Sequence, residues 1–143
     1  MTTKHWRIAL IAWMICIFIA SSSLLSFENT EKVLVSSTLN YMVRKLAHVV
    51  EYAILAYLWF RSLRTSSKPF TRVVSWSVLL SIVYATSDEW HQSFIPSRLG
   101  TWTDVVWDAA GAIIMGLILW YINRWGNEKT RQQILGIQKE EPV

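Results

Sequence analysis

The stretch SDEWHQSFIPSRLGTWTDVVWDAAG, residues 87–111, lies between two strongly apolar runs but carries four carboxylates. They belong to Asp88, Glu89, Asp104 and Asp108, and His91, Gln92 and Arg98 accompany them. Long apolar runs in a chain that is poor in charge are typical of membrane-spanning helices. We therefore expect this stretch to be the end of one span, a Pro-Ser-Arg turn and the start of the next span.

The composition of the chain agrees with a membrane protein built as one domain. Apolar residues make up 52% of the 143 positions and charged residues 17%, below the roughly 25% typical of soluble domains. The chain also has nine tryptophans and a mean hydropathy of +0.28. Its net charge of +4 does not indicate a nucleic-acid partner, because the basic residues stand at the ends of apolar runs rather than in one patch. The single cysteine, Cys16, is expected to be a buried, unreactive thiol.

Four apolar runs predict four transmembrane helices. They cover about residues 8–25, 43–63, 73–87 and 103–125. The third run is shorter than the roughly 20 residues that a span needs, so we expect it to extend at both ends and to carry Asp88 and Glu89 on its last turn. The first run is expected to stay in the protein as a helix, although its end, FIASSS, also resembles a signal-peptide cleavage site.

The segments around these runs complete the predicted organisation. VLVSSTLNYMV, residues 33–43, is too apolar for a solvated linker and is expected to form an interfacial helix or to extend the second span outward. Residues 1–126 are assigned to the four-helix domain. Residues 127–143 are polar and are expected to form a cytoplasmic tail that frays or lies on the membrane surface.

The distribution of charge predicts how the spans are oriented. Ten of the 14 lysine and arginine residues lie before the first run, from the last turn of the second run to the start of the third, or from the last turn of the fourth run onward. Seven of the 10 acidic residues lie on the opposite side. The positive-inside rule therefore predicts an all-α bundle of four transmembrane helices with cytoplasmic N- and C-termini and with residues 87–111 at the extracytoplasmic face.

Polar residues gather near the predicted outer ends of three helices. On the second helix they share one face: Lys45, His48, Glu51 and Tyr52. On the third and fourth helices they form pairs one turn apart: Asp88 with Gln92, and Asp104 with Asp108. Since a charged side chain at mid-bilayer costs about 2.5–3.5 kcal/mol on insertion scales, each of these charges needs a partner.

Some partners can be predicted from the spacing. Glu51 is expected to pair with Lys45 or His48 on its own helix. Asp104 is favoured by the positive end of its helix, whereas Asp108 lies one turn deeper and has no such explanation.

The connecting turn and the fourth helix add three further expectations. Arg98, which follows Pro96 in the turn, can bridge two carboxylates or bind a phosphate. His91 is expected to be exposed and to take no part in the cluster. The small residues Gly111, Ala112 and Gly116 would let the fourth helix approach a neighbour closely.

Three motifs together resemble the VanZ-like family of small bacterial membrane proteins. They are K-x-x-H-x-x-x-Y at Lys45, His48 and Tyr52, D-E-x-x-Q-x-F-x-P-x-R at Asp88, Glu89, Gln92, Phe94, Pro96 and Arg98, and D-x-x-x-D-x-x-G at Asp104, Asp108 and Gly111. The resemblance covers about residues 36–120. Ser97 stands where the family often has glycine, and Asp108 where it usually has asparagine. The extra carboxylate makes pairing with Arg98, Lys45 or another cation more necessary.

The family is named after an accessory teicoplanin-resistance factor of enterococci. The resemblance implies a multi-pass protein of the bacterial cytoplasmic membrane that acts in the cell envelope and in the response to glycopeptides. It implies no particular reaction and no cofactor.

The cluster has two leading functional interpretations and one structural interpretation. The first is an outward-facing pocket for an envelope lipid or a lipid-linked cell-wall precursor, in which Lys45 and Arg98 hold phosphate and the carboxylates and Gln92 bind sugar or peptide groups. The second is an enzyme that uses His48 with Asp88 or Glu89 as general base and acid on such a lipid. In the structural interpretation, the polar groups only lock the helices together.

Two further interpretations rank lower. A metal site would use the hard ligands His48, Asp88, Glu89 and Asp104, but no dense ligand motif such as HExxH is present. A channel would need several copies of so small a bundle. Membrane lipids are the expected partners, and a second copy of the chain or another envelope protein is a possible one.

Overall fold

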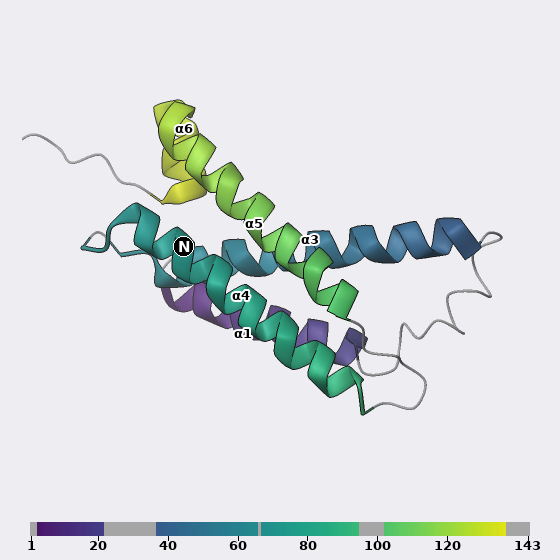
Figure 1. The fold of residues 1–143 in the computed structure, drawn as a ribbon. Helices are drawn as coiled ribbons and strands as arrows, with labels where there is room; N and C mark the ends of the chain where they lie inside the picture. The colour runs from purple at the N-terminus through teal and green to yellow at the C-terminus, as the bar shows by residue number, and fades with distance from the viewer. Residues whose placement is uncertain (1–2, 22–36, 66, 95–101, 137–143) are drawn as a thin grey trace, which may run out of the picture.

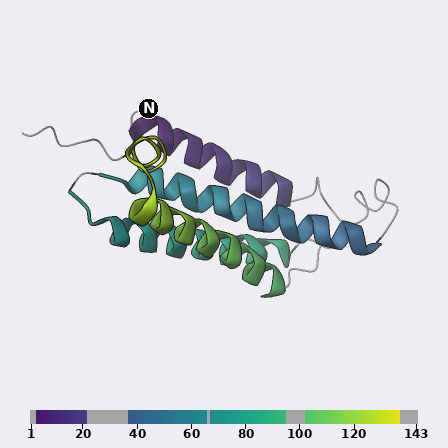
Figure 2. The same ribbon diagram turned by 90° about the horizontal axis from the view of Figure 1, so that it is seen from above.

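The computed structural model describes residues 3–21, 37–65, 67–94 and 102–136, and within these ranges it is all-α. Four long helices run side by side in alternating directions (Figure 1, Figure 2). They are α1 (Thr3–Ile19), α3 (Ser37–Leu63), α4 (Phe70–Gln92) and α5 (Trp102–Trp125). The short elements α6 (Glu128–Thr130) and η2 (Arg131–Leu135) follow at the end of the bundle where the N-terminus lies (Figure 1).

The central helix of the bundle is α3, which contacts α1, α4 and α5. One core cluster joins α3 to α1 and α4 and consists of Leu10, Ile17, Tyr52, Leu55, Leu58 and Ala85. A second joins α3 to α4, α5 and η2 and consists of Phe60, Val73, Leu119 and Leu135. Because α3 is covered by protein on several sides, its charged residues can be turned toward neighbouring helices.

Small residues on α5 allow it to approach α3 and α4 closely, as the sequence predicts. A Cβ atom added at Gly111 would lie 2.1 Å from the backbone oxygen of Val49 on α3, so only glycine fits at this crossing. At Gly116 an added Cβ would lie 2.9 Å from a methyl group of Val78 on α4, and Ala112 between these glycines is fully buried. These contacts hold the start of α5 against the middle of α3.

The outer surface of the bundle is strongly apolar. Two helices, α4 and α5, are long and apolar enough to cross a membrane. Large apolar side chains point outward from every long helix, including Ile11 of α1, Leu46 of α3, Val83 of α4 and Leu117 of α5, which are 57%, 65%, 57% and 61% exposed. Apolar surface this extensive fits a hydrocarbon environment better than water.

The predicted helix positions agree with the structure where residues are described. The third run extends at both ends to Phe70 and Gln92 and carries Asp88 and Glu89 near its end, as expected. The fourth begins one residue before its predicted start. The second begins at Ser37, so residues 37–43 extend this helix rather than forming a separate one. The first run was predicted to end at about residue 25, which lies outside the described residues. Within the described residues, α1 ends at Ile19.

The prediction that the tail frays is wrong for the part of it that the structure describes. Glu128–Leu135 is helical and folds back on the bundle, where Leu135 is fully buried. The guanidinium of Arg61 donates to the backbone oxygens of Gln133 and Ile134 at 3.0 and 2.8 Å and stacks on the ring of Trp6. Gly136 ends the turn with a φ of 66°, a conformation that favours glycine.

Two side chains lie in other surroundings than the sequence suggested. Cys16 is exposed rather than buried, because it lies on the outward, apolar face of α1. His91 is partly buried rather than exposed, since its ring stacks on Phe18 with 4.7 Å between ring centres. Neither position could be foreseen, because hydrophobic runs in a membrane helix do not reveal which face meets protein.

Candidate functional site

Two pairs of oppositely charged or hydrogen-bonded side chains join α3 to α5 at the end of the bundle opposite the N-terminus. Lys45 of α3 forms an ion pair with Asp104 of α5, and one turn along both helices His48 contacts Asp108, with 2.9 Å between Nδ1 and Oδ1. Asp108 is 1% exposed, so His48 balances a carboxylate that water does not reach. The repeated i, i+4 spacing on α5 thus matches the i, i+3 spacing on α3.

These pairs add to the pairs that the spacing suggested. Lys45 and His48 were expected to balance Glu51 on their own helix, and Asp108 was expected to pair with Arg98 or Lys45. The expected pairing of Glu51 stays a prediction, and the structure also joins both α3 residues to the carboxylates of α5. The reason is the close crossing at Gly111, which brings the start of α5 nearer to Lys45 and His48 than the helical spacing alone could show.

A second polar group joins α4 to α1. Asp88 of α4 accepts a hydrogen bond from the hydroxyl of Ser21 at 2.7 Å and another from the side-chain amide of Gln92 at 2.8 Å. Asp88 and Gln92 are 5% and 4% exposed. Asp88 and Gln92, which the spacing placed on one face of α4, are thus bonded to each other, and Ser21 is a partner that the sequence did not reveal.

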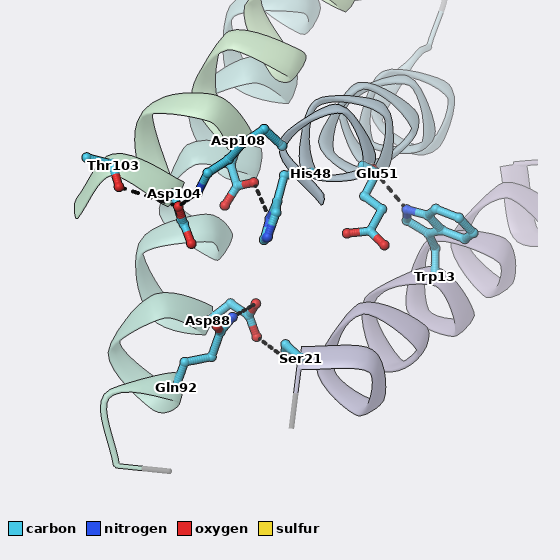
Figure 3. A network of polar contacts seen from close by, with 10 residues as sticks. Trp13, Ser21, His48, Glu51, Asp88, Gln92, Thr103, Asp104 and Asp108 are labelled. Atoms are coloured by element: carbon cyan, nitrogen blue, oxygen red, sulfur yellow. Dashed lines mark hydrogen bonds and ion pairs between the residues drawn. The ribbon is translucent and has the colours of Figure 1, made fainter. Parts of the chain in front are cut away.

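A cavity of about 150 Å³ lies between these two polar groups, where α1, α3 and α4 meet. Its polar lining consists of Ser21, Arg44, His48, Glu51, Tyr52 and Asp88. Its apolar lining consists of Ile17, Ala20, Val43 and Ala47. Figure 3 shows His48 and Glu51 of α3 facing the same space as Asp88 of α4 and Ser21 at the end of α1. The cavity therefore combines acidic, basic and neutral polar groups within an apolar bundle.

The hydroxyl of Tyr52 is the unusual group in this lining. Tyr52 is 1% exposed, and its hydroxyl has no hydrogen-bond partner among the residues that the structure describes. A buried hydroxyl without a partner costs about 1–3 kcal/mol, so such groups are rare unless a ligand or water completes them. Packing explains the Tyr52 ring, which belongs to the core cluster between α1 and α3, but it does not explain the hydroxyl.

Two hydrogen bonds fix α1 against α3 and α4 beside this cavity. The indole of Trp13 donates to the backbone oxygen of Glu51 at 3.1 Å, and Tyr84 of α4 donates to the backbone oxygen of Met14 at 2.7 Å. Figure 3 shows the first of these bonds beside the Glu51 side chain. The first helix was expected only to span the membrane, and its part in the cavity was missed because its residues there are mostly apolar.

The candidate residues predicted from the sequence fall into three groups. His48, Glu51, Tyr52 and Asp88 line the cavity. Lys45, Gln92, Asp104 and Asp108 form the hydrogen bonds and ion pairs around it. Glu89 is buried beside Asp88 on α4 but is not part of the lining, and Arg98 lies outside the described residues. Arg44, which does line the cavity, was not among the candidates.

The chemistry available at the cavity is that of hydrogen bonding and proton transfer. With Nδ1 of His48 bonded to Asp108, Nε2 is the nitrogen that can exchange a proton or a hydrogen bond with a ligand. Among the residues that the structure describes, no three histidine, cysteine, aspartate or glutamate side chains are grouped closely enough to hold a metal ion. The site thus offers a carboxylate-oriented imidazole together with a phenol, a serine hydroxyl and two further carboxylates.

Comparison with known proteins identifies one family. The model of the family described as VanZ/LLP1 matches residues 6–124, which include nearly all of the four long helices and every residue of the cavity lining. No curated protein and no solved structure matches the chain.

Proposed function

The chain belongs to the VanZ/LLP1 family, and from this premise we propose that its cavity binds the polar headgroup of an envelope lipid or of a lipid-linked cell-wall precursor. The family and the two long apolar helices make the chain a VanZ-type membrane protein. The observation that carries the binding proposal is the cavity with its unpartnered Tyr52 hydroxyl.

The proposed setting is the cytoplasmic membrane of a bacterium, with four spans and the cavity near the outer leaflet. Both termini then face the cytoplasm. Support comes from the sequence, in which ten of the 14 basic residues belong to the segments expected on the cytoplasmic side. In this orientation a headgroup enters the cavity from the lipid layer while its acyl chains stay outside.

The size of the cavity supports a headgroup rather than a whole lipid. Pockets for drug-sized molecules have about 300–1,000 Å³, whereas this cavity has about 150 Å³. The lining also favours a polar occupant, because an apolar group would leave the buried Tyr52 hydroxyl without a hydrogen-bond partner. The carboxylates of Glu51 and Asp88 accept hydrogen bonds from hydroxyl or amine groups, and Arg44 supplies a cation for a phosphate.

Helix packing alone does not account for all the polar residues. The pairs Lys45–Asp104 and His48–Asp108 are explained as a lock between α3 and α5. The Tyr52 hydroxyl joins neither pair, although it is buried within the same bundle. A phenylalanine would pack as well there, so the hydroxyl is better explained by a ligand.

An effect on glycopeptide susceptibility is the proposed consequence of this binding. A protein that holds a lipid-linked precursor at the outer leaflet changes how much precursor a glycopeptide can reach. Expression of the parent chain in a susceptible host is expected to raise the inhibitory concentration of teicoplanin, and a variant with a filled cavity is expected not to raise it.

The binding proposal is tested by filling the cavity without removing its polar groups. Ala47 is a small lining residue, so Ala47→Phe occupies the space where the headgroup would sit. Leu46→Phe is the matched control, because Leu46 is 65% exposed and is not part of the lining. The parent and both variants are purified from native membranes, and the lipids that stay bound are measured by mass spectrometry.

The parent and Leu46→Phe are expected to retain the same lipid, and Ala47→Phe is expected to lose it. If all three proteins carry lipids in the proportions of the bulk membrane, the cavity has no selective ligand and the proposal fails. Equal thermal unfolding of the two variants checks that a loss of lipid does not follow from misfolding.

A lipid-modifying enzyme is the second candidate function, and the Asp108–His48 pair favours it. A carboxylate that orients an imidazole is the arrangement by which enzymes prepare a general base. In this function Nε2 of His48 takes a proton from a hydroxyl or water at the lipid, and Asp88 or Glu89 serves as the acid.

The enzyme candidate is tested with His48→Gln. The parent and this variant are incubated with the lipid that co-purifies with the parent, and the mass of the lipid is followed over time. A change of lipid mass that only the parent produces supports an enzyme. An unchanged lipid that binds to the parent leaves binding as the function of the cavity.

A further inference from the structure

A second hollow lies at the opposite end of the bundle, near the N-terminus and α6. It is a groove of about 410 Å³ between the end of α3 and the first three turns of α4. Leu63, Lys68, Arg72, Val73, Trp76 and Leu80 line it. It shares no residue with the cavity described above.

The mouth of the groove is positively charged. Lys68 and Arg72 are exposed, and their side chains form no hydrogen bond or ion pair within the part of the chain that the structure describes. Between them α4 begins after Pro69, without a side-chain cap and without an acidic residue in its first turn. The N-terminus of a helix itself carries a partial positive charge, so two basic residues here repel it.

This arrangement is unfavourable in the absence of an anion. Helix starts commonly carry acidic or hydroxyl side chains, which satisfy the free backbone N–H groups. Here the free N–H groups belong to the first turn of α4, which Lys68 precedes and Arg72 belongs to, and a phosphate at this helix start would compensate the N–H groups and the cations together. The local departure from ordinary capping is thus explained by a ligand that the chain itself does not supply.

The body of the groove is apolar. Val73, Trp76 and Leu80 lie on one face of α4, at spacings of three and four residues. At 1.5 Å per residue, Arg72 and Leu80 are about 12 Å apart along the helix. Val73 is 2% exposed and forms the floor, whereas Trp76 is 53% exposed and stands as a side wall. A groove with a cationic mouth and an apolar body fits an amphipathic anion.

We propose that this groove binds one anionic phospholipid, with its phosphate at Lys68, Arg72 and the first turn of α4 and an acyl chain against Trp76 and Leu80. In the proposed orientation the groove opens to the cytoplasmic leaflet, where anionic headgroups attract basic residues. The bound lipid stabilises the start of α4 and its contact with the end of α3. This site does not depend on a ligand in the outer cavity.

The matched control is a second pair of cations at the same end of the molecule. Lys4 and Arg7 are exposed on the first turns of α1 and line no part of the groove. Membrane topology alone accounts for basic residues there. Lys4→Gln with Arg7→Gln therefore removes the same charge from the same end as Lys68→Gln with Arg72→Gln.

The test counts bound lipid by native mass spectrometry. The full chain in detergent is titrated with phosphatidylglycerol or phosphatidylcholine of identical acyl chains. We expect one phosphatidylglycerol to bind to the parent at lower concentrations than phosphatidylcholine. Since each basic residue near an anionic headgroup contributes about 1 kcal/mol, K68Q/R72Q is expected to bind phosphatidylglycerol about thirtyfold more weakly, and K4Q/R7Q like the parent.

Two further variants separate the alternatives. Leu80→Trp fills the body of the groove and leaves both cations, so it is expected to weaken phosphatidylglycerol binding, whereas Ala47→Phe in the outer cavity is expected to leave it unchanged. Equal losses in K4Q/R7Q and K68Q/R72Q would show a diffuse attraction of charge and overturn the proposal. Full binding by Leu80→Trp, or equal competition by inorganic phosphate, would show an anion site without an acyl chain and overturn it as well.

Discussion

Replacing Gly111 by alanine is expected to disturb both the stability of the bundle and its polar site. The added Cβ would lie 2.1 Å from the backbone oxygen of Val49 and 2.9 Å from the adjoining carbonyl carbon. Both atoms belong to the backbone of α3, so no side-chain rotation can relieve the clash. The two helices must separate by about 1 Å at this crossing to restore ordinary contact distances.

The magnitude follows from two opposing terms. Overpacking a well-packed interior costs about 1–3 kcal/mol, and a backbone clash belongs to the upper part of this range. Alanine gains about 1 kcal/mol over glycine in helix propensity. The net loss expected for Gly111→Ala is therefore about 2 kcal/mol. For Gly116→Ala it is close to zero, because the contact there is a methyl group of Val78 that can rotate away.

The same separation of α3 and α5 is expected to change the geometry of the polar site. His48 is the neighbour of Val49 on α3, and Asp108 lies almost one turn before Gly111 on α5, so the 2.9 Å contact between His48 and Asp108 lengthens when the helices part. Gly116 lies farther along α5 and faces α4, so its substitution leaves this contact unchanged.

The assay is the free energy of unfolding of the two variants in the same detergent or bilayer, together with the amount of lipid that each retains. Gly111→Ala is expected to be about 2 kcal/mol less stable than Gly116→Ala and to retain less lipid. Equal stability of the two variants would show that α3 and α5 do not cross at Gly111 as described, and would refute the reasoning.

Three further substitutions test other parts of the account. Tyr52→Phe removes the unpartnered hydroxyl, so in lipid-free protein it is expected to raise the free energy of unfolding by about 1–3 kcal/mol. The same variant is expected to retain less lipid, and a loss of stability would show that the hydroxyl has a partner. Asp108→Asn keeps an acceptor for His48 and is expected to change the free energy of unfolding by less than about 1.5 kcal/mol, whereas Asp108→Leu is expected to lower it by about 3–5 kcal/mol. Both values are measured by thermal unfolding, and losses of the same size in the two variants would exclude a role for this pair in packing. Arg61→Gln removes the donor to Gln133 and Ile134, so amide hydrogen exchange in residues 131–136 is expected to accelerate at least tenfold, and unchanged exchange would mean that Arg61 does not hold this turn.

Much of the helical arrangement could be predicted from the sequence, because its causes are local. Apolar runs limited by basic residues mark helix ends, so α4 and α5 begin and end within a few residues of their predicted positions. The small residues on α5 correctly predicted a close approach, since only glycine tolerates a neighbouring backbone at 2.1 Å. The VanZ-like assignment was also correct, because its motifs depend on residue identity and spacing alone.

The partners of the polar residues were harder to predict, because they depend on how one helix is placed against another. Spacing on α3 suggested partners for Glu51 on its own helix, but it could not show that the crossing with α5 brings Asp104 to Lys45 and Asp108 to His48. Ser21 and Arg44 were missed for a related reason. Serine is common in membrane helices, and arginine at a helix end is common at membrane interfaces, so neither residue type indicates a site.

The exposed face of each helix and the fold of the tail also escaped prediction. A helix that is apolar from residue 8 onward, such as α1, has little contrast between its faces there, so Cys16 could not be assigned to the outer surface. The tail is polar on average, but the buried side chain of Leu135 and the bonds from Arg61 fix residues 128–135 against the bundle. Such long-range contacts leave no periodic pattern in the sequence.

The most direct test of the central proposal is a photo-crosslinking residue, p-benzoylphenylalanine, placed at Ala47 and, in a separate protein, at Leu46. Both proteins are irradiated in native membranes, purified and weighed by mass spectrometry. The proposal predicts one dominant lipid adduct at position 47 and a mixture of bulk membrane lipids at position 46. The same mixture of adducts at both positions would contradict a headgroup site in this cavity.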